Sequence, residues 1–404
     1  MSTTGTAAKN TTKDLGHGLI LRWSTPADIE KIATLTGNVF RNKEDAPPNV
    51  RMMDQMRIIM RGDHPFMTPE EFAVVEETSK PERPLVACTC LWQHKWSYAG
   101  IPFTAGRPEF VASLPEYRNR GLIRHIFNLL HERSDSRGDL MQGITGIPYF
   151  YRQFGYEMVL DLGARRCASV NLVPEKKEDE QEQCTLRPAT VADAPLLTML
   201  HNRNRGDSLL WHEVDEAYWC YLVSYWDDPS IRLADRTMVG MNAQPYMILD
   251  PNDNVLGMIV IGHHRWGRDV SVYELALAEG TNLQAIVPSL LRLLRAHGEQ
   301  APVMRTDGPP FSQISFQLGC AHPIYALMGS VITPDHEDPY AWYIRVPDVP
   351  AFIQHIAPIL EARLAQSVLT SHNGELLFDF YRGGLRLVWE RGKLTAAEPW
   401  RPPT

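Results

Sequence analysis

The same short pattern occurs in both halves of the chain. The sequence Leu21–Asp28 (LRWSTPAD) is echoed by Leu186–Asp193 (LRPATVAD), with Leu, Arg, Thr, Ala and Asp in register. A second match aligns Gln153–Gly155 with Gln317–Gly319. The length of 404 residues exceeds what one ordinary hydrophobic core can fill. The repeat therefore predicts two lobes with the same order of strands and helices.

The first half contains a loop that is suited to a phosphate group. An apolar, strand-like run ends at Val111–Ser113, and Arg118-Asn119-Arg120-Gly121 then leads into a segment with apolar residues at helical spacing. A glycine at a helix start leaves the first backbone N–H groups uncovered, and the helix dipole favours negative charge there. From the residues alone, a helix start with two solvated arginines explains this pattern equally well.

The sequence downstream of this loop favours the phosphate interpretation. A strand-like run over residues 140–145 is followed by Tyr151-Arg152-Gln153-Phe154-Gly155-Tyr156. The order of strand, Arg-x-x-Gly, helix, strand and Tyr-x-x-Phe-Gly-Tyr resembles the acetyl-CoA-binding core of the GCN5-related N-acetyltransferases (GNAT). The family pattern is (Gln/Arg)-x-x-Gly-x-(Gly/Ala), and Ile123 stands where its last small residue is expected.

The second half lacks the features that would hold a phosphate. The segment Glu274–Asn282 takes the place of the loop, has no arginine, and contains Glu279, which would repel a pyrophosphate. The position equivalent to Tyr151 in this alignment is Ser315. We therefore expect a degenerate second lobe, and one acetyl-CoA site per chain, in the first lobe.

A third pattern begins after Pro334. A strand is predicted over 340–346, a helix over 349–365, and a hairpin over 375–381 and 385–390 around Arg382–Gly384. Two acetyltransferase-like lobes followed by such a segment resemble the enhanced intracellular survival (Eis) group, whose third lobe is similar to sterol carrier protein. We expect mixed α/β lobes with mostly antiparallel sheets flanked by helices. The predicted division is a disordered tail over 1–17, a catalytic GNAT lobe over 18–172, a charged linker over 173–183, a degenerate GNAT lobe over 184–334, and a shortened sterol-carrier-like lobe over 335–404.

The resemblance also implies roles for particular residues. Tyr151 would protonate the departing thiolate, which suits a phenol because its pKa is near that of a thiol; Tyr149 and Tyr156 compete for this role. Backbone N–H groups around Ser113 would bind the oxyanion, and the terminal carboxylate of Thr404 would act as base. From the residues alone, Glu109 is either a base, directly or through water, or a solvated carboxylate at the strand end. Acetyl-CoA would be held by the strand end and the loop, which comprise Val111, Ala112, Ser113, Arg118, Asn119, Arg120, Gly121, Leu122 and Ile123.

We therefore expect an acetyl-CoA-dependent N-acetyltransferase that moves the acetyl group directly to an amine in a ternary complex, without a metal. Members of the Eis group acetylate amines, so the acceptor is expected to be an aminoglycoside, a polyamine or a lysine-like amine. The resemblance also implies a homo-oligomer, with a hexamer favoured. The alternative is a non-catalytic sensor that binds acyl-CoA or a lipid.

Composition and charge exclude several other classes. A net charge of −8 with dispersed arginines argues against nucleic acid as a partner. No apolar run reaches the length of a membrane span, and residues 1–10 lack the apolar segment of a signal peptide, so we expect a cytoplasmic protein. Cys88 and Cys90 would face the same side of a strand, where a buried structural role is favoured over a metal site.

Overall fold

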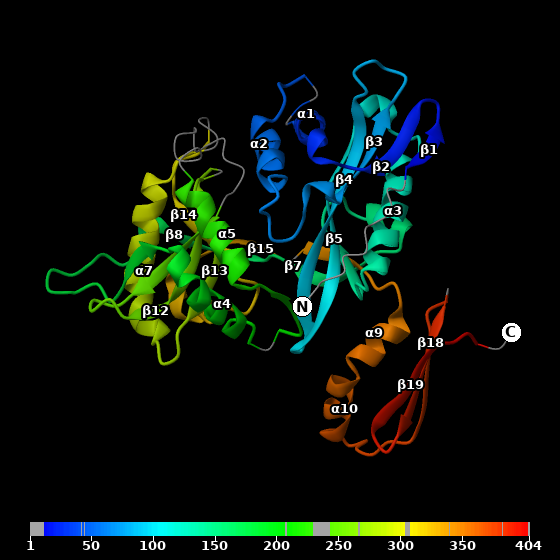
Figure 1. Ribbon diagram of the computed structural model, residues 1–404. Coiled ribbons are helices and arrows are strands. Elements are labelled where there is room, and N and C mark those ends of the chain that lie inside the picture. Colours follow the sequence, from blue (N-terminus) through cyan, green and yellow to red (C-terminus); the bar gives the residue numbers. More distant parts are fainter. Residues whose placement is uncertain are drawn as a thin grey trace.

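A computed structural model of the chain describes residues 12–402, apart from 42, 44, 207, 229–242, 266, 304–307, 339 and 382. In this part of the chain the strands form three sheets, one in each of three lobes (Figure 1). Strand pairs are antiparallel except for one parallel pair in each of the two larger sheets. The expected fold class, tandem mixed α/β lobes with helices against mostly antiparallel sheets, is confirmed.

The first sheet is covered by helices on both faces. Its strands follow the order β1 (Lys13–Gly16), β2 (Leu19–Trp23), β3 (Phe72–Glu77), β4 (Leu85–Tyr98), β5 (Ile101–Ser113), β6 (Met141–Ile144), β16 (Tyr340–Arg345) and β7 (Glu157–Leu162), with β10 (Leu210–Glu213) beside β4. Helices α1 (Ile29–Val39) and α2 (Val50–Ile59) pack with Phe72, Cys88 and Cys90 on one face. Helix α3 (Leu122–Ser136) packs with Leu21, Val75 and Ala87 on the other. The two cysteines are buried in the core on one face, as expected.

The second sheet repeats this plan. Its strands follow the order β15 (Ile332–Glu337), β8 (Arg165–Ser169), β14 (Gln313–Phe316), β13 (Asp269–Leu277), β12 (Val255–Gly262), β11 (Ala243–Leu249) and β9 (Thr185–Pro188). The α-helices in the described part of this lobe are α4 (Ala194–Arg203), α5 (Glu216–Asp227), α7 (Leu283–Gln300) and the short α8 (Ile324–Met328). Helices α4 and α5 pack on one face of the sheet and α7 on the other, as the matching helices do in the first lobe.

The repeated sequence forms the same structure in both lobes. Thr25 and Asp28 make a capping box at a 3-10 turn, η1 (Pro26–Asp28), and Thr190 and Asp193 make the same box at η6 (Val191–Asp193). In each lobe the arginine of the repeat then binds the capping carboxylate with both terminal guanidinium nitrogens. The shared Arg, Thr and Asp therefore fix the entry of the first helix in both lobes.

Three strands do not lie in the lobes that the predicted boundaries gave them. β10 falls within the predicted degenerate lobe but pairs with β4 of the first sheet. β8 falls within the predicted catalytic lobe but pairs with β14 and β15 of the second sheet. β16 falls within the predicted third lobe but lies between β6 and β7 of the first sheet. The lobes therefore exchange strands, which periodicity cannot reveal, because it identifies a strand but not its partner. β1 is a further correction, since its residues 13–16 lie in the segment predicted as a disordered tail.

The charged linker is anchored to the second lobe. Arg292 of α7 forms ion pairs with Glu180 at 2.7 Å and with Glu182 at 2.6 Å, and Arg295 pairs with Glu175 at 2.8 Å. These ion pairs therefore attach the charged part of the connector to α7, while Val173 at its start is buried in the hydrophobic core of the second lobe.

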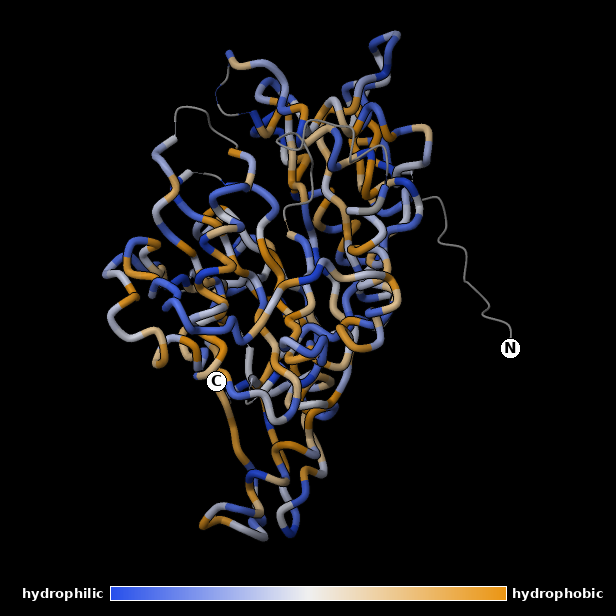
Figure 2. Tube along the Cα trace, turned by 90° about the vertical axis from the view of Figure 1, so that its left-hand side faces the viewer, coloured by the Kyte–Doolittle hydropathy of each residue, from blue (hydrophilic) through white to orange (hydrophobic). Residues whose placement is uncertain are grey.

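The third lobe is a small sheet with two helices against it. The single helix predicted over 349–365 is two helices, α9 (Val349–His355) and α10 (Ala357–Ala365), because Pro358 lacks the N–H that a continuous helix needs. The predicted hairpin forms as β17 (Gly374–Asp379) and β18 (Gly384–Glu390), and β19 (Lys393–Pro399) was not predicted. Figure 2 shows this lobe projecting from the other two. Every residue of β17 is exposed, including Leu376, Leu377 and Phe378.

None of the helices in the described part of the chain is long and apolar enough to cross a membrane.

Candidate active site

A cleft opens in the first lobe where β5 and β6 separate. The two strands pair only at Ala105 and Gly106 of β5, so the rest of β5 has no β6 partner among the described residues. A bulge at Phe110, with φ of 55°, shifts the register between β4 and β5 just after this point. The bulge and the separation together leave the end of β5 with one open edge.

The backbone N–H groups of Val111 and Ser113 face this open edge. Leu114 donates its N–H to the carbonyl of Val86 on β4 at 3.0 Å. Successive residues of a strand direct their N–H groups to opposite edges, so those of Ser113 and Val111 point away from β4. An extended ligand lying along this edge would therefore meet unpaired backbone groups.

The N-terminus of α3 opens into the same cleft. Its N-cap is Gly121, with φ of 74°, and no described side chain caps the helix. A Cβ at this position would project into open space, so the backbone is accessible from outside. Arg118 and Arg120 are exposed beside this terminus and donate to the backbone carbonyls of Ser113 and Glu116. The site therefore combines free N–H groups, a positive helix end and two guanidinium groups.

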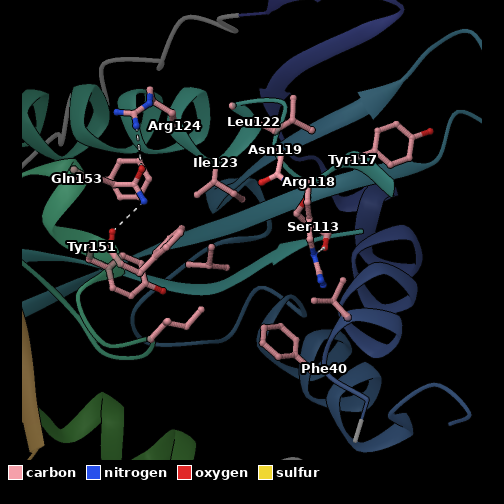
Figure 3. A pocket seen from close by; sticks show the side chains of 16 residues that line it. Phe40, Ser113, Tyr117, Arg118, Asn119, Leu122, Ile123, Arg124, Tyr151 and Gln153 are labelled. Carbon is pink, nitrogen blue, oxygen red and sulfur yellow. Dashed lines mark hydrogen bonds between the residues drawn. The ribbon is translucent and has the colours of Figure 1, made fainter. Parts of the chain in front are cut away.

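The cleft joins these elements into one cavity of about 650 Å³. Its volume lies within the range of roughly 300–1,000 Å³ that is usual for small-molecule sites. Figure 3 shows Ser113, Arg118 and Asn119 at one end, Tyr151 and Gln153 at the other, and Ile123 between them. Of the nine predicted cofactor-binding residues, the cavity is lined by Val111, Ser113, Arg118, Asn119, Gly121, Leu122 and Ile123. Arg120 is adjacent, and Ala112 points into the core with Cys88 and Cys90.

Among the three candidate tyrosines, the cavity is lined by Tyr151. Its side chain, on the short helix η4 (Phe150–Phe154), is buried against Phe127, and burial raises its pKa to about 12, with a smaller contribution from the charge of Glu109. The phenol is therefore protonated at neutral pH and holds a proton that it can give. Tyr156 is fully buried and bound to His131 at 3.0 Å, and Tyr149 is 63% exposed.

Just before the bulge, β5 carries Arg107, a residue that the sequence did not single out. Arg107 pairs with Glu109 at 2.6 Å and lies over the rings of Trp92 and Trp342. Trp342 belongs to β16, so its approach to Arg107 depends on the strand exchange. Glu109 thus has a fixed partner, and its charge contributes to the pKa of Tyr151. Thr404, the other candidate base, lies outside the described residues.

The corresponding region of the second lobe is closed by the chain itself. The N-terminus of α7 is capped by Asn282, whose side chain accepts from the N–H of Ala285. Ala278 donates to Leu256 just as Leu114 does to Val86, so Leu275 corresponds to Val111. The carbonyl of Leu275 accepts a hydrogen bond from His322 at 3.3 Å. Both the helix end and the strand edge are therefore occupied.

The predicted equivalence of Tyr151 and Ser315 is wrong. Ser315 lies on β14, which corresponds to β6 because each pairs in parallel with the strand before the loop. Gln317–Gly319 follows directly after that strand, whereas Gln153 and Phe154 are the last residues of η4 and Gly155 is its C-cap. Only the glutamine and the glycine match between these two segments. Aligning them by this chance match paired segments that differ in structure.

Comparison with known proteins supports the expectation of an acetyltransferase domain in the first lobe. A sequence model described as an acetyltransferase (GNAT) domain matches residues 21–159, which include β5, the loop, α3 and Tyr151. The first lobe is a GNAT acetyltransferase domain. This match identifies an N-acetyltransferase domain in the first lobe, and acetyl-CoA is the co-substrate that GNAT acetyltransferases use. No curated protein matches the sequence.

Solved structures share the fold along nearly the whole chain. A GCN5-related N-acetyltransferase from Kribbella flavida is 17% identical, with a TM-score of 0.61 over 96% of this chain and 84% of that one. A probable N-acyltransferase from Enterococcus faecalis is 10% identical, with a TM-score of 0.61 over 95% and 86%. Eis1 from Mycobacterium abscessus is 13% identical, with a TM-score of 0.54 over 95% and 85%. The expected similarity in fold to the Eis group is thereby confirmed.

Proposed function

We propose that the chain transfers the acetyl group of acetyl-CoA directly to an amine in the cleft of its first lobe. The observation that carries this proposal is the uncapped N-terminus of α3, which opens into the same cavity as the free edge of β5 and the Tyr151 side chain. Along the cleft, the helix end suits a diphosphate, the open strand edge suits an extended arm, and the Tyr151 phenol suits a thioester.

Each part of acetyl-CoA has a proposed contact. The pyrophosphate binds the N–H groups at the start of α3, with Arg118 and Arg120 adding charge. The pantetheine arm lies along Val111–Ser113 as an added strand would, and its amides pair with the open backbone edge. The acetyl carbonyl then lies near the N–H groups of this edge, which stabilise the oxyanion that forms when the amine attacks.

The proton steps use one acid and one base. As the tetrahedral intermediate collapses, the C–S bond breaks and the Tyr151 phenol donates its proton to the leaving sulfur. The attacking nitrogen loses a proton, and we assign its acceptance to Glu109, directly or through water. This assignment is supported by the place of Glu109 on β5, two residues before Val111, which lines the cavity.

The acceptor is proposed to be a small amine of the aminoglycoside, polyamine or lysine class. The net charge of −8 favours the approach of a cation. The test is a screen for release of free CoA thiol from acetyl-CoA with tobramycin, spermidine and a lysine-containing peptide. Acceptor-dependent release supports transfer. Binding of acetyl-CoA without release for any amine would favour the sensor function instead.

We also propose that the protein is a cytoplasmic homo-oligomer, with a hexamer favoured, and that its third lobe is sterol-carrier-like. The exposed apolar residues of β17, an edge strand, support assembly, because such an edge can pair with another chain. Light scattering at micromolar concentration tests this, and a monomer would contradict it.

A further inference from the structure

Strand β16 brings a buried tyrosine to the back of the active site. Tyr343 has no exposed surface, and its ring packs against that of Tyr151 with centroids 5.5 Å apart and planes at 65°. β16 lies between β6 and β7, although it follows the whole second lobe in sequence. A residue remote in the chain is therefore in direct contact with the proposed acid.

The hydroxyl groups of β16 hold the loop that carries Tyr151. The N–H of Tyr149 donates to the hydroxyl oxygen of Tyr343, and this hydroxyl donates to the carbonyl of Ile147 at 3.3 Å. The hydroxyl of Tyr340 donates to the carbonyl of Gly146 at 3.1 Å. Three backbone groups just before η4 are thus bound by side chains from one strand.

These contacts hold a backbone conformation that the loop would not favour by itself. Tyr149 has φ of 63°, in the left-handed region that is unfavourable for a residue with a side chain. Such conformations persist when surrounding contacts impose them, and here the contacts include the hydroxyl of Tyr343. Tyr151 is two residues further along, so the direction of its phenol depends on this turn.

We propose that Tyr343 is a positioning residue for the Tyr151 acid, so that the strand after the second lobe completes the active site of the first. The proposal rests on the proposed role of Tyr151. Proton transfer requires the phenol within hydrogen-bond reach of the sulfur, and small displacements of a catalytic group cost large factors in rate. Removing the Tyr343 hydroxyl frees the turn while the ring still packs.

The first test separates turnover from binding. Tyr343→Phe is expected to lower kcat by about tenfold to a hundredfold, with acetyl-CoA affinity unchanged, since the cofactor contacts lie on β5 and α3. Tyr340→Phe should cause a smaller loss, because it removes one bond to the loop. Tyr98→Phe is the control, because Tyr98 packs on Phe352 of the third lobe, and it should leave kcat unchanged. A Tyr343→Phe protein with full turnover would overturn the proposal.

The second test asks whether Tyr343 acts through Tyr151. Turnover is measured with the best acceptor among tobramycin, spermidine and a lysine peptide, for Tyr151→Phe, Tyr343→Phe and the double variant. If Tyr343 only positions the phenol, the double variant should match Tyr151→Phe. Losses that multiply would overturn the positioning role and leave the acid role of Tyr151 intact. Full activity of Tyr151→Phe would instead refute the acid assignment itself.

Hydrogen exchange gives a readout that needs no acceptor. The Tyr149 amide should exchange faster in Tyr343→Phe than in the parent protein, because its hydrogen bond to the hydroxyl is lost. Exchange in α3 should be unaffected. Unchanged protection of Tyr149 would show that the hydroxyl does not hold the turn, and would contradict the proposal.

Discussion

The two larger lobes share one arrangement of strands and helices. They differ in whether the backbone groups at one helix N-terminus and one strand edge have hydrogen-bond partners. In the first lobe, α3 begins at Gly121 with no described side chain capping it, and the edge of β5 is open. In the second lobe, Asn282 caps α7 and His322 binds the carbonyl of Leu275. The fold supplies a helix end and a strand edge in both lobes. Only the lobe that leaves them unpaired offers them to a ligand.

This difference has an energetic side. A side-chain cap typically stabilises a helix by about 1 kcal/mol, so the first lobe gives up stability at the place where it can bind a phosphate. The second lobe keeps that stability and loses the site. The comparison can be tested by substitutions in the two lobes, whose expected effects range from a loss of acetyl-CoA binding to a change in stability.

The largest effect is expected from two glycines, Gly121 at the N-cap of α3 and Gly280 two residues before the N-cap of α7. Gly121 and Gly280 have φ of 74° and 80°, and a Cβ at either meets nothing within 4 Å. Gly121→Val and Gly280→Val should therefore strain the backbone to similar extents. Only Gly121→Val should reduce acetyl-CoA affinity, by more than about a hundredfold, because the new side chain covers the N–H groups. Calorimetry with both variants measures this, and equal losses would refute the difference between the lobes.

The second effect concerns turnover. Tyr151→Phe should lower kcat by about 10²- to 10⁴-fold, the usual range for a general acid, and leave acetyl-CoA affinity almost unchanged. Tyr149→Phe and Tyr156→Phe should reduce turnover much less, since neither tyrosine lines the cavity. Steady-state kinetics with a verified acceptor checks this. If all three variants keep full activity, the proton comes from water or from the substrate.

The third effect compares charges beside the two helix starts. Arg118→Ala should weaken acetyl-CoA binding by about tenfold, because it removes one charge-assisted contact to phosphate. Glu279→Ala should not change the affinity, since this exposed carboxylate pairs with Arg203 in the lobe whose helix end is capped by Asn282. Titrations at low and high salt should show the Arg118 effect shrinking with ionic strength. An altered affinity for Glu279→Ala would contradict the comparison.

The smallest effect is on stability and uses the repeated capping box. Asp28→Ala should cost about 2 kcal/mol and Asp193→Ala about 1 kcal/mol, because the Asp28 side chain is 5% exposed and that of Asp193 is 15% exposed. The pKa of Asp193 is lowered to about 2 from its ordinary 3.8, chiefly by the hydrogen bond from Arg187.

The direction of this pKa shift gives a pH dependence. A carboxyl group with a depressed folded pKa contributes stability that is complete above about pH 4 and lost as the pH falls toward 2. The stability difference between Asp193→Ala and the parent should therefore be constant near neutral pH and shrink below pH 4. Denaturant unfolding at several pH values checks this, and a constant difference down to pH 2 would contradict it.

The sequence predicted the parts of the site that are local in the chain. The run from Val111 to Ile123 becomes a strand end, a loop and a helix as expected, because its glycine and apolar spacing act over a few residues. The Tyr151 assignment also rests on a local motif, and the structure places that residue in the cavity.

The sequence could not predict contacts between segments far apart in the chain. Tyr343 and Trp342 were assigned to a third lobe, and their places beside Tyr151 and Arg107 follow from the insertion of β16 into the first sheet. His322 carried no signal, since its role depends on the carbonyl of Leu275. Pairing of distant strands is decided by packing, which residue periodicity does not encode.

The number of acetyl-CoA molecules bound per chain tests the central claim most directly. Isothermal titration of the full chain with acetyl-CoA should give one site, because the first lobe leaves its helix end and strand edge open and the second closes both. The same titration of Gly121→Val, at the concentrations used for the parent protein, should show no binding. Gly280→Val should still give one site. Two equivalent sites per parent chain would contradict the account.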